Sequence, residues 1–140
     1  MLLAMLVVSV GDLVFQARFE AAAEKTVSAL VSRLPMRSKI IQARWSGEAA
    51  WVPMGALDLG VALENATSYP APGHLLFYPG GHSETEILFA YGATCFASRL
   101  GQLAGSHFAT VIEGNERLGE LGRRVLWEGA QEIGFELTGC

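Results

Sequence analysis

The feature that most constrains this chain is a series of short segments in which apolar and polar residues alternate with a period of two. Residues 6–19 contain two such segments on either side of the dipeptide Gly11-Asp12, and the second places Phe15 and Ala17 on one face. Alternation of this kind is typical of half-buried β-strands, and a glycine-containing dipeptide between two of them indicates a hairpin. The chain therefore begins as an antiparallel sheet.

Further strand patterns recur along most of the chain, interrupted by two helical ones. The strands are predicted over residues 40–45, 49–54, 73–79, 84–91, 104–112 and 131–137, and the helices over 20–34 and 114–129. The first helix shows apolar residues at a spacing of three and four and ends at Pro35. Residues 55–72 have no sustained period and form the longest irregular connection. We therefore expect a mainly β protein, a closed β-barrel with two helices, because closure removes exposed strand edges.

Composition limits the classes of function. With 140 residues, the chain is predicted to form one domain over residues 1–140. Hydrophobic residues make up 51% of the sequence, so apolar surface is expected to remain after one core is filled, which favours a homo-oligomer. The net charge is -4 and the basic residues are scattered, so nucleic acid is not an expected partner.

The N-terminal segment MLLAMLVVSV is apolar but does not resemble a targeting sequence. It has no basic beginning and no small-residue cleavage site, and it is too short to span a bilayer. We expect a cytoplasmic protein without membrane partners, and Met5 is an alternative start. The two cysteines, Cys95 and Cys140, lack metal-type spacing, and no cofactor-binding motif occurs, so no cofactor and no resident metal are predicted.

Several sequence blocks resemble known proteins. AAAEKTVSAL at residues 21–30 is similar to the first-helix segment of cyclophilins, and TVIEG at 110–114 to the strand before their second helix. ARWSGEAAWVP, ENATSYPAPGHLLFYPGG, SETEILFAYG, GQLAGSHF and VLWEGAQEI together resemble a bacterial family of cyclophilin-like proteins of unknown function. This resemblance covers nearly the whole chain. It implies the cyclophilin-like barrel and brings no reaction with it.

The prolyl isomerase site of true cyclophilins is largely missing. That site has an arginine in a Phe-His-Arg strand and a Phe-Met-x-Gln-Gly-Gly segment, whereas the corresponding strand here, SKIIQARWSGEAAW, retains only Arg44 of that pattern. A divergent peptidyl-prolyl isomerase is therefore an alternative function rather than the first one.

The segment FYPGGHSETEILFAYG places three polar residues two apart before an apolar run. If this segment is extended, His82, Glu84 and Glu86 project from one face. They are interpreted as an outward-facing polar row, as the lining of a pocket, or as a ligand set for a metal ion. A dry pocket would raise the pKa of one carboxyl, whereas a facing Arg44 would keep both ionised and suit a small molecule that carries both charges.

The leading hypothesis is a protein that binds or acts on a small polar metabolite at the barrel mouth. A possible ligand is a small polar or carboxylated molecule, and the predicted ligand-binding residues are Arg44, Glu64, Asn65, Tyr69, Glu84, Glu86 and His107. The alternatives are the divergent isomerase and a structural subunit without its own activity. A lone histidine at the start of an apolar strand, such as His107, is more often structural than catalytic. Trp45 and Trp51 are predicted to form a cross-strand pair. No catalytic residue is predicted.

Overall fold

The chain forms a closed antiparallel β-barrel of eight strands in a computed structural model that describes residues 4–138. The order around the barrel is β2-β1-β11-β3-β4-β7-β6-β10, and β10 pairs again with β2 to close it. These strands are β1 (Leu6–Val10), β2 (Leu13–Phe19), β3 (Met36–Gln42), β4 (Gly47–Pro53), β6 (His74–Tyr78), β7 (Glu86–Thr94), β10 (Gly105–Glu113) and β11 (Gln131–Leu137). The predicted closed barrel is confirmed.

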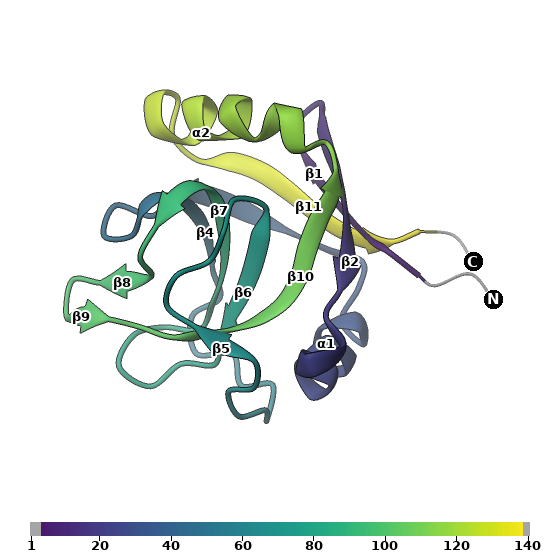
Figure 1. The fold of residues 1–140 in the computed structure, drawn as a ribbon, viewed down its shortest axis with the longest axis vertical. Helices are drawn as coiled ribbons and strands as arrows, with labels where there is room; N and C mark the ends of the chain where they lie inside the picture. The colour runs from purple at the N-terminus through teal and green to yellow at the C-terminus, as the bar shows by residue number, and fades with distance from the viewer. Residues whose placement is uncertain (1–3, 139–140) are drawn as a thin grey trace.

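Two α-helices lie at opposite ends of the barrel (Figure 1). Helix α1 (Glu24–Val31) follows a short 3-10 turn, η1 (Ala21–Ala23), and contacts β10. Helix α2 (Leu118–Trp127) follows η2 (Asn115–Arg117) and packs against β3, β4 and β7. Both predicted helices are confirmed. Within residues 4–138, neither has the length and apolar character needed to cross a membrane.

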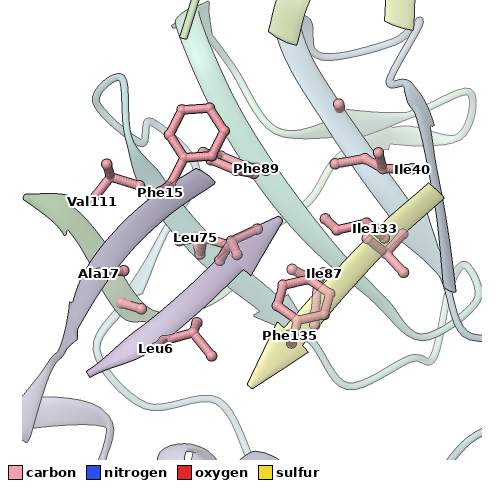
Figure 2. Packing of buried hydrophobic residues seen from close by; sticks show 14 of the residues in the cluster. Leu6, Phe15, Ala17, Ile40, Leu75, Ile87, Phe89, Val111, Ile133 and Phe135 are labelled. Atoms are coloured by element: carbon pink, nitrogen blue, oxygen red, sulfur yellow. The ribbon is translucent and has the colours of Figure 1, made fainter. Parts of the chain in front are cut away.

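The barrel interior is filled by apolar side chains from every wall. Figure 2 shows residues of this core, among them Phe15, Leu75, Phe89 and Ile133, which come from different strands and point toward one another. The rings of Phe15 and Phe89 meet edge to face, with centroids 5.4 Å apart. Close packing of this kind leaves little room for a ligand inside the barrel.

Strands β6 and β7 are buried on both faces, which explains the apolar run that follows Glu86. On β7, Ile87 and Phe89 belong to the interior core, whereas Leu88 belongs to a second apolar cluster. Because successive side chains on a strand point to opposite faces, this second cluster lies outside the barrel wall. Phe96 and Leu103 cover it, on either side of a small hairpin formed by β8 (Ala97–Ser98) and β9 (Gly101–Gln102).

The structure corrects three details of the sequence prediction. Strand β3 begins at Met36 rather than at residue 40 and ends before Arg44, and β7 begins at Glu86 rather than at residue 84. His82 and Glu84 therefore lie in the connection before β7, and the three polar side chains do not form an extended row. The third detail is the existence of β5 (Ala66–Thr67), β8 and β9, two-residue strands that are too short to show a period.

Candidate functional site

A cavity of about 640 Å³ lies beside the outer face of β3, β4 and β7. Its polar lining comes from the end of β3, the β3–β4 turn, the segment before β7, the start of β7, and the β8–β9 hairpin; these residues are Gln42, Arg44, Ser46, Ser83, Glu86, Ser98 and Arg99. Trp45, Trp51 and Leu126 contribute apolar surface. Ligand pockets are of this size and of this mixed character. The cavity lies outside the barrel wall, whereas sequence analysis places the site at the barrel mouth.

Glu86 is the most unusual residue of this cavity. It shares the outward face of β7 with Leu88, and only 5% of its surface is exposed. Among residues 4–138, no hydrogen bond or ion pair reaches its carboxyl group. Burial raises the pKa of Glu86 to about 8, and the negative charge of Glu84 adds to this effect. Glu86 is therefore mainly protonated near neutral pH and can both donate and accept a hydrogen bond.

Glu84 reaches this neighbourhood from the loop before the strand. One of its carboxylate oxygens, Oε2, accepts a hydrogen bond from the backbone N–H of Gly55 at 2.9 Å. This contact fixes Glu84 against the start of the irregular segment 55–72. Its charge therefore acts on Glu86 from a defined position rather than as a freely moving side chain.

Two guanidinium groups line the same cavity without a carboxylate partner. Among the described residues, neither Arg44 nor Arg99 forms an ion pair, although five other basic residues do. Arg44 lies over the ring of Trp45, with 6.0 Å between the guanidinium carbon and the ring centroid. Unpaired guanidinium groups beside aromatic rings are suited to a planar carboxylate.

The β8–β9 hairpin that carries Arg99 is fastened at its base. The hydroxyl of Ser46 donates to the carbonyl oxygen of Ala97 and accepts the Ala97 N–H, both at 3.1 Å. Phe96 is buried and meets Tyr78 edge to face. The tip is not covered, since Leu100 is exposed. The hairpin therefore holds one wall of the cavity against the barrel.

Of the seven residues predicted from the sequence, three belong to this region, since Arg44 and Glu86 line the cavity and Glu84 acts on Glu86. A second group, Glu64, Asn65 and His107, lies between α1 and β10. There the backbone N–H of His107 donates to the carbonyl oxygen of Asn65, and the Asn65 side-chain amide donates to the carbonyl oxygen of His107. None of these three residues lines the cavity.

Glu64 supplies a cap for helix α1. Its Oε1 accepts the backbone N–H of Thr26 in the first turn of the helix at 2.6 Å, and this hydrogen bond is the main reason why the pKa of Glu64 is lowered. The residue at the N-cap position, Ala23, has no side chain that could cap the helix by a hydrogen bond. A carboxylate at a helix N-terminus satisfies a free N–H and interacts favourably with the helix dipole.

His107 belongs to a hydrogen-bonded chain on the outer face of β10. Its Nε2 lies 2.8 Å from the hydroxyl of Thr110, which donates to the Glu20 carboxylate at 2.7 Å. The imidazole of His74 stacks on that of His107 with ring centroids 4.0 Å apart. Burial is the largest cause of a lowered pKa at both histidines. This arrangement supports the structural interpretation of His107.

Tyr69 lies apart from both groups. It is 67% exposed, and its hydroxyl contacts Oε1 of Gln102 on β9 at 3.4 Å. It connects the irregular segment to the β8–β9 hairpin and does not line the cavity.

Sequence reasoning missed several residues of the cavity. Trp45 lies in the turn between β3 and β4, not on a strand, so the predicted cross-strand pair with Trp51 does not form, and both residues line the cavity. Arg99 was missed because the β8–β9 hairpin has no detectable period. Ser83 and Ser98 carry no pattern that distinguishes them from ordinary loop residues.

The metal interpretation of His82, Glu84 and Glu86 gains no support. Within residues 4–138, no three histidine, cysteine, aspartate or glutamate side chains come together in a way that could hold a metal ion. The backbone N–H of His82 instead donates to the Tyr78 hydroxyl at 3.0 Å.

The barrel and its outer cavity define a class of small β-barrel protein, and comparison with known proteins places the chain in a family. Residues 6–137 match the family described as "Protein of unknown function (DUF3830)". The chain belongs to this family. A search of curated proteins finds no match.

A comparison of folds finds a solved structure described as "Structure of McbB in complex with tryptophan". The TM-score is 0.66 at 15% sequence identity, and the match covers 96% of this chain. It covers 45% of the other chain, so this protein spans about half the length of that neighbour. The likeness shows a shared barrel fold.

Proposed function

We propose that this protein binds a small carboxylated molecule with an aromatic or apolar part in the cavity around Glu86. The observation that carries the proposal is the combination of a buried, unpaired Glu86 with the unpaired guanidinium groups of Arg44 and Arg99 in one cavity. Because Glu86 lines the cavity, a ligand that enters can exchange a hydrogen bond with its carboxyl group in place of water.

Each part of the cavity suits one part of such a ligand. The two arginines offer bidentate donors to a carboxylate, and the Trp45 and Trp51 side chains offer apolar surface to a ring. Protonated Glu86 can donate to a carbonyl or accept from an amine, and it holds a proton that it can transfer to a bound molecule. The structural neighbour was solved with tryptophan, a small molecule that combines a ring with a carboxylate.

Thermal-shift measurements with indole-3-acetate, L-tryptophan and the methyl ester of indole-3-acetate test this proposal. A bound ligand in large excess raises the melting temperature, and we expect about 3 to 6 °C with the acids and less than about 1 °C with the ester. Arg44→Gln combined with Arg99→Gln should abolish the rise. Arg33→Gln is the matched control, because this exposed arginine lies outside the cavity. An equal response to the ester, or no response to any of the three, would contradict the proposal.

The same samples separate the alternative functions. Acceleration of proline-limited refolding would favour a divergent isomerase, whereas a multimer without ligand response would favour a structural subunit. A homo-oligomeric state and a cytoplasmic location remain predictions from composition and sequence.

A further inference from the structure

A second cavity of about 410 Å³ adjoins the first one at the end of the barrel beneath α2. Gln42 and Leu126 line both cavities. The second cavity is otherwise lined by groups that the first one lacks, among them Glu48, Tyr91 and Trp127. Since two of the lining residues are shared, the cavities adjoin at Gln42 and Leu126, and the two together are called the groove.

The two ends of this groove differ in charge. The first cavity carries the unpaired guanidinium groups of Arg44 and Arg99, and its one carboxyl group, Glu86, is mainly protonated near neutral pH. In the second cavity, Glu48 is the only carboxylate among the lining residues. The Arg123 guanidinium in that lining is already paired with Glu120. One end therefore favours an anion and the other a cation.

Glu48 is held in place without being neutralised. Its Oε1 accepts the backbone N–H of Ala93 at 2.8 Å, and among the described residues it has no basic partner. The second carboxylate oxygen is therefore available to an ammonium group.

Aromatic rings complete this end of the groove. The Tyr91 hydroxyl donates to Oε1 of Gln42 at 2.7 Å, which fixes its ring against α2, where a side chain at Gly122 would overlap it. Trp127 is 80% exposed although it is a large apolar residue. A carboxylate beside aromatic faces is a favourable environment for an organic cation.

We infer that the ligand is an extended zwitterion, with its carboxylate beside Arg44 and Arg99 and a primary or quaternary ammonium group at its far end beside Glu48, Tyr91 and Trp127. This inference rests on the proposed function, because it assigns the carboxylated half of the ligand to the first cavity. It adds the length of the ligand and the charge of its other end.

A matched pair of compounds tests the inference by isothermal titration calorimetry near neutral pH. N-(ω-aminohexanoyl)-L-tryptophan and N-hexanoyl-L-tryptophan share the carboxylated aromatic half and differ in the terminal ammonium group. The wild-type protein should bind the amine about fivefold more tightly, as expected for a partly exposed ion pair with cation–π contacts. Glu48→Gln keeps the oxygen that accepts the Ala93 N–H. This variant should reduce the difference in affinity between the two compounds to less than about twofold, and it should bind the hexanoyl compound as the wild-type protein does.

Glu136→Gln serves as the control, because it removes the same charge from an exposed position outside both cavities. It should preserve the fivefold preference. Equal binding of the two compounds by the wild-type protein, or a preference that survives Glu48→Gln, would overturn this inference and leave the proposed function standing. Failure of both compounds to bind, while indole-3-acetate still raises the melting temperature, would overturn this inference alone, whereas failure of indole-3-acetate and L-tryptophan as well would overturn the proposed function with it.

Discussion

The two faces of β7 show how one strand serves two purposes. Its inward side chains, Ile87 and Phe89, belong to the interior core, to which all eight barrel strands contribute. Of its outward side chains, Leu88 shares an apolar cluster with Phe96 and Leu103 beside the short hairpin, and Glu86 lines the cavity. Closure packs the inner face closely and leaves a void of only about 10 Å³ beside Ile87, whereas the looser outer cover leaves a cavity with a buried carboxyl group. Stability is therefore concentrated inside the barrel and the candidate site outside it.

The largest effect is expected from the inner face. Phe89→Ala should lower the free energy of unfolding by about 4 kcal/mol, because it removes a fully buried ring that meets Phe15 and leaves a void. Urea denaturation followed by circular dichroism measures this loss.

Phe96→Ala sharpens the contrast between the faces. Its ring covers the outer cluster beside the hairpin that carries Arg99, so we expect a loss of about 3 kcal/mol together with weakened binding of carboxylated ligands. Under conditions in which both variants are folded, Phe89→Ala should bind carboxylated ligands more tightly than Phe96→Ala does. If both variants lose binding equally, the separation of the two faces is wrong.

Glu86→Gln should change how stability depends on pH. Because the pKa of Glu86 rises from 4.5 in the unfolded chain to about 8 in the folded protein, the folded state binds the extra proton. Its contribution is fully present below pH 4.5 and is lost as the pH rises toward 8. The size of this contribution is at most about 5 kcal/mol, and we expect about 3 kcal/mol after relaxation of the site. The variant should lack this decline in urea denaturation series across the range, and an unchanged decline would show that Glu86 is not its source.

Glu64→Ala tests whether the second group of polar residues serves structure rather than ligand binding. Loss of the hydrogen bond to Thr26 at the start of α1 should lower the free energy of unfolding in urea denaturation, with ligand affinity unchanged. Glu24→Ala, in the first turn of the same helix, is the comparison variant. A loss of ligand affinity in Glu64→Ala would bring this group back into the site.

The smallest effect concerns the histidine pair. The pKa of His74 is lowered, first by burial and then by the neighbouring His107, with Glu20 opposing and Arg18 adding slightly. A histidine whose pKa falls on folding contributes stability that is lost as the pH drops below its ordinary value of 6.5. His74→Asn keeps an acceptor for the Ala71 N–H and should reduce this acid sensitivity in thermal unfolding curves.

Much of the fold could be predicted because it depends on local patterns. Period-two alternation locates β2, and the Gly11-Asp12 turn predicts its pairing with β1. Pro35 marks the end of the first helical region. What the sequence does not reveal is the cover over the outer face of β7, because it depends on a hairpin of two-residue strands and on single anchors such as Phe96.

The candidate site was predictable only in part for the same reason. The pairing of β3 with β4 and of β4 with β7 places Arg44 and Glu86 in the lining of one cavity. Glu64 looks equally functional in the sequence, but its carboxylate caps a helix 38 residues away. No local pattern reports a contact of that range. Arg99 becomes a candidate only once the hairpin is seen against the barrel.

The central claim is that Glu86 is a protonated carboxyl group in a cavity outside the barrel wall. Titration of the Glu86 side-chain carboxyl by ¹³C NMR, with Glu86→Gln to assign the signal, tests it most directly. We predict a midpoint of about 8. A midpoint near the ordinary value of 4.5 would show that water solvates this carboxyl freely and would contradict the account.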